Sequence, residues 1–210
     1  MTPSSSKKRP VLLADRDGTL IRDVPYLSRI EDVALLPGVA EAIARLNRAG
    51  IPVAIVTNQS GVARGYFPEE FVLETQARIM ELLEAAGARV DAFYYCPHLE
   101  PGADLREGSG GLPHLLRACD CRKPAPGLLL RALSDLSGDP VRSAIVGDAD
   151  RDMKAGEAAG CGWGYRILQD GERTEERPRI TLVRSFSEAV EIYLAGLSPE
   201  GRSGNGAGGR

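Results

Sequence analysis

Two carboxylates stand two residues apart near the start of this sequence, just after a short apolar run. Asp15 and Asp17 follow residues 11–13, and Gly18 allows a sharp turn behind them. Residues two apart in an extended chain point to the same side, so both carboxylates can face one site. We interpret this pair as catalytic or metal-binding rather than as part of a solvated turn.

A second pair of acids follows another apolar run, at residues 144–146. Asp148 comes almost directly after this run, and Asp152 falls on the first turn of a predicted helix. One of these acids could simply cap that helix. Beside the first pair, however, Asp148 would complete an oxygen-lined site of the kind that Mg²⁺ prefers.

Polar and cationic side chains complete the set of candidates. Hydroxyl and amide groups follow the apolar run at 53–56 in one stretch: Thr57, Asn58, Gln59 and Ser60. Lys123 opens a later helical pattern. Alone, such residues are as typical of turns, helix caps and solvated surfaces as of a functional site. Their position relative to the acids therefore decides their interpretation.

Apolar periodicity predicts the elements that must position these residues. Four short apolar runs indicate buried strands, at 11–13, 53–56, 90–95 and 144–146. Amphipathic patterns predict four helices, at 38–49, 69–86, 127–136 and 151–159. Strands that alternate with helices predict a doubly wound parallel α/β sheet. Ligands bind beyond the carboxyl ends of such strands, which is where the candidate residues fall.

The order of these motifs resembles that of the haloacid dehalogenase-like phosphatase superfamily, over residues 11 to about 167. The first motif of that family, Asp-x-Asp-Gly-Thr, matches Asp15, Asp17, Gly18 and Thr19. The later motifs, a threonine, a lysine and a pair of acids, match Thr57, Lys123, Asp148 and Asp152. The resemblance implies a Rossmann-like fold that hydrolyses phosphate esters.

The resemblance also assigns catalytic roles. Asp15 would attack phosphorus and form an aspartyl phosphate. Asp17 would protonate the leaving alkoxide and then activate the water that hydrolyses this intermediate. Thr57 and Lys123 would hold the phosphate oxygens. A phosphate dianion repels an anionic nucleophile, so these donors and a metal ion are needed to offset the charge.

The implied catalytic metal is Mg²⁺. Its ligands would be the carboxylates of Asp15 and Asp148 and the backbone carbonyl of Asp17. Asp152 would orient Lys123 or a water bound to the metal. Carboxylate and carbonyl oxygens are the ligands that Mg²⁺ prefers in proteins.

Three of the four cysteines and one histidine bracket the stretch 96–121, which shows little periodicity. Cys96 and His98 stand at its start, and Cys119 and Cys121 stand at its end. Three thiolates and one imidazole form the soft tetrahedral set typical of structural Zn²⁺. A loop this long inside a compact domain is unusual unless something orders it. We therefore predict a zinc-held loop at 96–121.

This loop narrows the resemblance to one branch, which contains D-glycero-D-manno-heptose 1,7-bisphosphate phosphatases and histidinol-phosphate phosphatases. Members of this branch have little or no cap domain. A heptose bisphosphate carries a second phosphate, which favours arginine, whereas histidinol phosphate carries an amine and an imidazole, which favour carboxylates. In the histidinol branch an Asp commonly occupies the place of Ser60.

Arg64 and Arg122 stand near the predicted site. We therefore expect hydrolysis of the 7-phosphate of the heptose bisphosphate, giving heptose 1-phosphate for the synthesis of nucleotide-activated heptose. Histidinol-phosphate hydrolysis is the alternative. Contacts to the substrate are expected from Asn58, Gln59, Ser60, Arg64 and Arg122.

Composition limits the remaining possibilities. The chain has 210 residues, of which 43% are hydrophobic and 26% charged, and this is typical of a soluble globular protein. We assign one domain to residues 9–197, with the Ser- and Lys-rich stretch 1–8 and the Gly-rich stretch 198–210 as disordered tails. The formal net charge of −3 does not suggest a nucleic-acid partner.

The sequence also lacks membrane signals. No apolar run approaches the roughly 20 residues of a membrane helix, and the apolar residues after the basic N-terminus are too few for a signal peptide. We expect a cytoplasmic monomer whose cysteines are reduced or metal-bound.

A receiver domain that accepts phosphate on an aspartate is the alternative from another class. It too gathers acids, a threonine and a lysine on a parallel α/β fold. A receiver, however, is phosphorylated after a middle strand and needs a much shorter chain. Asp15 and Asp17 after the first strand, together with the predicted zinc loop, argue against it.

Overall fold

The computed structural model describes most of the chain between residues 8 and 198. The described ranges are 8–23, 27, 29–103, 111–169, 172 and 177–198. Most of each predicted tail, 1–7 and 199–210, and the middle of the predicted zinc loop, 104–110, lie outside the described residues.

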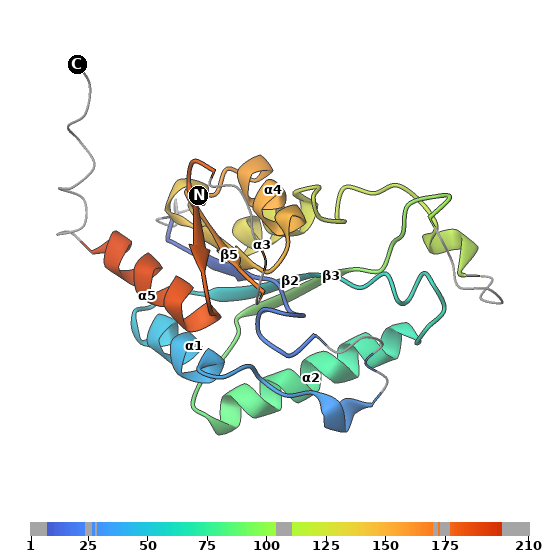
Figure 1. Cartoon of the computed structure of the whole chain (residues 1–210), viewed down its shortest axis with the longest axis horizontal. Helices are drawn as coiled ribbons and strands as arrows, with labels where there is room; N and C mark the ends of the chain where they lie inside the picture. The colour runs from blue at the N-terminus through green and yellow to red at the C-terminus, as the bar shows by residue number, and fades with distance from the viewer. Residues whose placement is uncertain are drawn as a thin grey trace, which may run out of the picture.

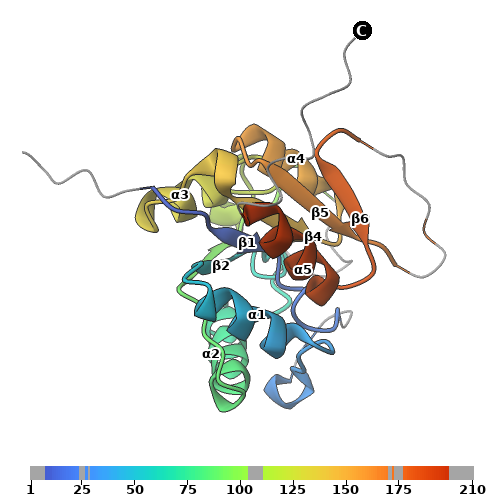
Figure 2. The ribbon, with the colours of Figure 1, turned by 90° about the vertical axis from the view of Figure 1, so that its left-hand side faces the viewer.

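Within these ranges six parallel strands form one sheet in the order β3-β2-β1-β4-β5-β6. Figure 2 shows the part of this sheet from β2 to β6. The strands are β1 (Leu12–Ala14), β2 (Val53–Asn58), β3 (Ala92–Cys96), β4 (Ala144–Gly147), β5 (Trp163–Ile167) and β6 (Ile180–Val183). The chain runs outward from β1 to β3 and then returns to β4 on the other side of β1. Such a reversal opens a crevice at the carboxyl ends of the central strands.

Among the described residues, five α-helices cover the two faces of the sheet (Figure 1). They are α1 (Val39–Arg48), α2 (Glu69–Ala85), α3 (Gly127–Asp135), α4 (Asp150–Ala158) and α5 (Phe186–Leu197). Residues of α1, α2 and α5 pack on one face, and residues of α3 and α4 pack on the other. The predicted doubly wound α/β fold is confirmed. In the described part of the chain, no helix is long and apolar enough to cross a membrane.

Three single-turn 3₁₀ helices lie in the connections: η1 (Ile30–Asp32), η2 (Pro113–Leu115) and η3 (Pro140–Arg142). In the described residues, η1 is the only helix between β1 and α1, and η2 the only helix between β3 and α3. No cap domain is therefore evident in these connections, as predicted.

The core explains why the strands are apolar without alternation. On β1, Leu12 and Ala14 pack toward α1, α2 and α5, whereas Val11, just before β1, and Leu13 pack toward α3 and α4. All four side chains are fully buried. A strand that helices cover on both faces needs apolar residues at every position. The strand that leads into Asp15 is thus fixed in the middle of the molecule.

Strands β2 and β3 end later than predicted, and this matters for the site. β2 continues through Thr57 to Asn58, and β3 continues to Cys96. The register pairs Asn58 with Cys96. A predicted zinc ligand and a predicted substrate contact are therefore neighbours across two hydrogen-bonded strands.

Candidate active site

The ammonium group of Lys123 lies between two carboxylates below the carboxyl edge of the sheet. Its Nζ is 2.9 Å from Asp15 Oδ1 and 2.6 Å from Asp152 Oδ1, and it donates to the carbonyl of Val56 at 2.8 Å. The three charged side chains are all buried. Because little water reaches them, their mutual attraction is stronger than at the surface. This network fixes the positions of both Asp15 and Lys123.

A second set of hydrogen bonds joins Asp17 to the end of β2. The Arg16 guanidinium forms an ion pair with Asp17 at 3.1 Å, while the Arg16 backbone N–H donates to Asp15 Oδ1 at 2.7 Å. Gln59 Nε2 donates to Asp17 Oδ2 at 2.7 Å and to Thr57 Oγ1 at 2.9 Å. Four residues that the sequence singles out are therefore in one connected group.

Asn58 has a positioning contact that the sequence does not indicate. Its Nδ2 donates to the backbone carbonyl of Lys123 at 3.0 Å, and its Oδ1 accepts from the backbone N–H of Lys123 at 3.0 Å. The side chain thereby holds the segment with Lys123 against the end of β2, in addition to lining the pocket described below.

Three carboxylates converge near this lysine. Oxygens of Asp15, Asp148 and Asp152 lie within 4.8 Å of one another. One ammonium cannot balance three carboxylates, so the group attracts a further cation. The Asp17 carboxylate is outside this group, and the contact of its backbone carbonyl with the metal stays a prediction.

The surroundings of Asp148 fit a hard cation such as Mg²⁺. Its Oδ1 is buried without a hydrogen-bond partner among the described residues. Burial, followed by the charges of Asp15 and Asp152, raises the pKa of Asp148 to about 6. A divalent cation would remove this penalty, because it satisfies the free oxygen and offsets the repulsion. The absence of a side chain at Gly18 provides space for the Asp148 carboxylate, because a Cβ at Gly18 would collide with it.

A pocket of about 290 Å³ opens over Asp15 and Asp17. Seven of the predicted site residues line it: Asp15, Asp17, Thr57, Asn58, Gln59, Ser60 and Arg64. Lys123, Asp148 and Asp152 are not part of its lining. Arg122 also lies outside the lining, with its Nη1 donating to the carbonyl of His98 at 3.2 Å. Arg122 is therefore beside the pocket rather than in its wall.

Several lining residues are not indicated by the sequence. Asp23 and Arg151 contribute charge, Thr75 of α2 contributes a hydroxyl, and Tyr66, Phe67 and Phe71 contribute aromatic rings. Aromatic and hydroxyl residues on a helical pattern look like core residues in the sequence. Arg151 has a weak signal, because it directly precedes the motif acid Asp152.

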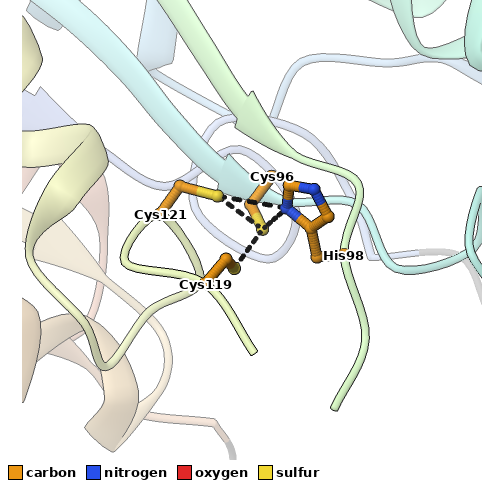
Figure 3. A group of neighbouring side chains, drawn as sticks. All are labelled: Cys96, His98, Cys119 and Cys121. Atoms are coloured by element: carbon orange, nitrogen blue, oxygen red, sulfur yellow. Dashed lines mark hydrogen bonds between the residues drawn. The ribbon is translucent and has the colours of Figure 1, made fainter. Parts of the chain in front are cut away.

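The predicted zinc ligands meet in one cluster (Figure 3). Cys96 Sγ lies 3.6 Å from Cys119 Sγ and 3.2 Å from Cys121 Sγ. The Nδ1 of His98 lies 3.5 Å from Cys96 Sγ and 3.3 Å from Cys121 Sγ. Ligands of a tetrahedral zinc ion with bonds of about 2.0–2.3 Å are roughly 3.3–3.8 Å apart. Three of the four distances lie in this range and the fourth, between Cys96 and Cys121, is just below it, so the cluster is consistent with such a site.

The electrostatics of this cluster also favour a cation. Burial raises the pKa of Cys96 and of Cys121, so without a metal these thiols stay protonated. Burial and the nearby Arg117 lower the pKa of His98, which keeps the imidazole neutral. Zn²⁺ binds neutral imidazole and thiolate. Its positive charge would stabilise the thiolates and so offset the free energy needed to deprotonate the cysteines.

This fold and this site define a class of protein. The family model of the haloacid dehalogenase-like hydrolases matches residues 14–160, which span all the acids of the site and Lys123. The chain thus belongs to the haloacid dehalogenase-like hydrolases, and the alternative of a receiver domain is wrong.

Comparison with individual proteins narrows the family. The chain is 37% identical to the D-glycero-D-manno-heptose-1,7-bisphosphate 7-phosphatase of Thermosynechococcus vestitus, over 91% of this chain and 98% of the relative. It is 43% identical to the D-glycero-beta-D-manno-heptose-1,7-bisphosphate 7-phosphatase of Mesorhizobium japonicum, over 92% of this chain and 84% of the relative. Within the hydrolases, the chain therefore belongs to the D-glycero-D-manno-heptose-1,7-bisphosphate 7-phosphatase family.

A solved structure of similar shape agrees with this placement. The crystal structure of D,D-heptose 1,7-bisphosphate phosphatase from B. bronchiseptica, complexed with magnesium and phosphate, has a TM-score of 0.74. Its sequence is 27% identical to this chain, and the match covers 89% of this chain and 98% of that one.

Proposed function

We propose that this protein is a Mg²⁺-dependent phosphatase that removes the 7-phosphate of D-glycero-D-manno-heptose 1,7-bisphosphate. The products would be inorganic phosphate and heptose 1-phosphate, an intermediate for nucleotide-activated heptose. The observation that supports this most is the buried contact of Lys123 with Asp15 and Asp152 beside Asp148. The relatives at 37% and 43% identity bear the name of this activity.

The first half of the proposed reaction transfers the phosphoryl group to the enzyme. A carboxylate oxygen of Asp15 attacks phosphorus, and the bond between phosphorus and the sugar oxygen breaks. Asp17 gives its proton to the leaving alkoxide. Thr57 and Lys123 hold the equatorial phosphate oxygens. The ion pair of Lys123 with Asp15 supports this role, because it holds the nucleophile against its own repulsion from the phosphate.

The second half releases phosphate. Asp17, now ionised, takes a proton from water, and the water oxygen attacks the phosphorus of the aspartyl phosphate. The acyl phosphate bond breaks and Asp15 is restored as a carboxylate. Arg16 and Gln59 hold Asp17 in place, which supports its use as a base at a fixed position.

We assign the metal to Asp15, Asp148 and the backbone carbonyl of Asp17. Mg²⁺ at this position offsets the negative charge of the phosphate and of the acids. Asp152 positions Lys123 rather than the substrate, because its two oxygens already contact Lys123 and the backbone N–H of Ala149. We assign structural Zn²⁺ to Cys96, His98, Cys119 and Cys121.

We also propose that the enzyme acts as a monomer in the cytoplasm. The large hydrophobic side chains that are exposed are distributed over several elements: Leu73, Met80, Leu130, Val141 and Ile192. Such scattered residues do not form an obvious interface. No disulfide joins the four cysteines, which supports a reducing compartment. Light scattering of the purified protein tests the oligomeric state.

Arginine recognition of the second phosphate is the basis for choosing the substrate. Arg64 lines the pocket, and Arg122 lies beside it. Ser60 supplies a hydroxyl group at a position where the cationic amine of histidinol phosphate would favour a carboxylate. Asp23 in the pocket lining is the one observation that would suit histidinol phosphate, so that substrate belongs in the test.

The test is a phosphate-release assay with Mg²⁺ on a panel of substrates. The panel contains both anomers of heptose 1,7-bisphosphate, histidinol phosphate and fructose 1,6-bisphosphate. We expect the highest kcat/KM for one anomer of the heptose bisphosphate, with release of one phosphate per sugar. A higher kcat/KM for histidinol phosphate would move the assignment to the alternative branch.

A further inference from the structure

Arg151 is a cationic pocket residue to which the proposed mechanism gives no role. It is the second residue of α4, it lines the pocket over Asp15 and Asp17, and it is exposed. In the described part of the chain its side chain forms no hydrogen bond or ion pair. Its charge acts on Asp23, Asp148 and Asp152 without direct contact, so its N–H donors are available to a ligand.

The acids on either side of Arg151 are occupied by other cations. Asp150 forms ion pairs with Lys154 at 2.8 Å and with Arg177 at 3.1 Å. Asp152 contacts Lys123 at 2.6 Å. Neither flanking carboxylate forms an ion pair with Arg151, although the charge of Arg151 acts on Asp152 and opposes the rise of its pKa. Asp23 lines the same pocket, but no ion pair joins it to Arg151.

The start of α4 is nevertheless held at a fixed place relative to the catalytic group. Asp152 Oδ2 accepts from the backbone N–H of Ala149 at 3.0 Å, while its Oδ1 faces Lys123. Through these contacts the first turn of α4 is tied to the lysine that contacts Asp15. The backbone of Arg151 thus has a defined position beside the nucleophile, and only its side chain is free to adapt.

The surroundings of Arg151 contain both carboxylates, Asp23 and Asp148 among them, and guanidinium groups. A cation in the first turn of a helix opposes the helix dipole, which favours negative charge there. Arg122 lies near Arg151 and Arg64. Burial lowers the pKa of Arg122 most, and the charges of Arg151 and Arg64 lower it further. Arg64 and Arg151 line the same pocket, and Arg122, beside it, is close enough for both of their charges to act on it. Like charges gathered in this way are typical of a site for a multiply charged anion.

We propose that Arg151 is a specificity-determining residue that binds the phosphate that is not cleaved, together with Arg64 and Arg122. This inference deepens the proposed function and rests on it. The ligand class is a sugar bisphosphate whose second phosphate is a dianion. The planar fork of a guanidinium matches two phosphate oxygens at once, which an ammonium cannot do.

The test compares one substrate that has the second phosphate with one that lacks it. The kcat/KM of Arg151→Ala is measured on heptose 1,7-bisphosphate and on heptose 7-phosphate. A charge-assisted hydrogen bond of ordinary strength predicts a loss of about tenfold to a hundredfold on the bisphosphate, mainly through KM. The monophosphate should change by less than about twofold, because it has no anion at this place. Arg151→Lys should recover part of the loss.

Lys154→Ala is the matched control. It removes a cation from the same helix, one turn further on, where the side chain pairs with Asp150 and does not line the pocket. We expect it to leave both substrates unchanged. Equal losses of Arg151→Ala on both substrates, or an unchanged kcat/KM on the bisphosphate, would overturn the inference.

The two failures can be told apart. A wild-type enzyme that does not prefer heptose 1,7-bisphosphate contradicts the proposed function. In that case the role of Arg151 is tested by the loss of kcat/KM in Arg151→Ala relative to wild type, measured on fructose 1,6-bisphosphate and on fructose 6-phosphate. A selective loss on the bisphosphate of that pair would still support an anion-binding Arg151, and equal values would overturn it.

Discussion

At the scale of single residues, the site depends on how Asp15 is held. Its Oδ1 accepts from the backbone N–H of Arg16 and faces the Lys123 ammonium, so the carboxylate has one orientation. A nucleophile that is already oriented loses little entropy when the substrate binds. Oriented in this way, Asp15 suits nucleophilic attack as well as metal binding.

Asp15→Asn tests the nucleophile. An amide has nearly the same shape but cannot form the aspartyl phosphate, so we expect turnover to fall at least ~10³-fold. Asp150→Asn is the control, because Asp150 is an exposed acid of α4 outside the pocket lining. It should retain nearly full turnover in the same phosphate-release assay. Wild-type turnover in Asp15→Asn would show that another group attacks phosphorus.

Asp148→Asn tests the electrostatics of the metal site through stability. The folded protein raises the pKa of Asp148 to about 6, above its usual value near 3.9, so it binds this proton more tightly than the unfolded chain does. The resulting destabilisation is absent below pH ~4 and complete above pH ~6. In magnesium-free buffer at pH 7.5, we therefore expect Asp148→Asn to be more stable than wild type by on the order of 1 kcal/mol.

Thermal unfolding in magnesium-free buffer at pH 4 and pH 7.5 gives the comparison. The difference between variant and wild type should disappear at pH 4, where both side chains are neutral. Added Mg²⁺ should stabilise the wild type at pH 7.5 and not the variant. A variant that is less stable than wild type at pH 7.5 without Mg²⁺ would contradict this account.

The candidate residues that the sequence predicts are those fixed by local order along the chain. Asp15 and Asp17 are recognisable because they follow a buried strand at a spacing of two, and Asp148 because it follows another. Arg151 and Asp23 are not recognisable in this way. Their place in the pocket depends on how a helix start and a loop come together in the folded chain, which no spacing rule describes.

At the scale of elements, the cysteine and histidine cluster connects to the pocket. Cys96 is the last residue of β3 and pairs with Asn58 of β2, while Arg122 directly follows Cys121 and donates to the carbonyl of His98. The position of Arg122 therefore depends on how the two ends of the predicted zinc loop are joined. A change in the cluster should therefore reduce the preference for the bisphosphate substrate more than it reduces the rate of phosphate-ester hydrolysis.

Cys119→Ser tests this connection. We expect less than one zinc per chain by elemental analysis, a lower Tm, and a loss of kcat/KM on the bisphosphate of about tenfold. A small generic phosphate ester should be much less affected, because it has no contact with Arg122. Cys161→Ala is the control, since Cys161 is a buried thiol beside α4 that is not one of the clustered ligands. Full zinc content and unchanged selectivity in Cys119→Ser would refute the role of the cluster.

The elements missing from the sequence prediction have a physical explanation. β5 contains Gly164 and Arg166, so it is not an apolar run, and Arg166 is accepted in the strand because it pairs with Glu172. β6 lies at the edge of the sheet and keeps the polar Thr181. Edge strands and strands with paired charges lack the continuous apolar signal that makes β1, β2 and β4 recognisable.

Helix α5 is different, because its signal is present in the sequence. Its buried residues Phe186, Ala189, Val190 and Tyr193 follow the spacing of one helix face, and Ser185 caps its start by accepting from the backbone N–H of Glu188. A complete search for helical periodicity would therefore find α5. It would not show that the helix packs against α1 and the sheet.

At the scale of the whole molecule, the candidate active site and the contacts that hold α5 lie at opposite ends of the parallel strands. The acids and Lys123 gather at the carboxyl ends of β1, β2 and β4. The hydroxyl of Tyr193 on α5 instead donates to the carbonyl of Arg142 at 2.7 Å and lies 3.4 Å from that of Val11, both of which precede the strands β4 and β1. The hydrogen bonds that hold α5 on the sheet can thus be removed without changing a residue of the candidate active site.

Tyr193 makes this separation testable. The side chain is fully buried and packs edge-on against Trp163 and Tyr165, with ring centroids 5.6 and 6.4 Å away. Tyr193→Phe removes only the hydroxyl and leaves the Arg142 carbonyl without this donor, so we expect a loss of about 1–2 kcal/mol in the free energy of unfolding. Tyr193→Ala also opens a cavity between α5 and the sheet, and we expect a loss of about 3–5 kcal/mol.

Urea unfolding measures both losses, and kcat/KM on the folded fraction at 25 °C measures the effect on the site. Because the Tyr193 contacts lie at the amino-terminal edge of β1 and β4, both variants should keep kcat/KM within about twofold of wild type while they remain folded. A variant that loses stability by the expected amount and keeps its activity would show that α5 serves the fold alone. A tenfold loss of activity in Tyr193→Phe would instead mean that the sheet transmits the disturbance along β1 to Asp15, and that the two edges are coupled.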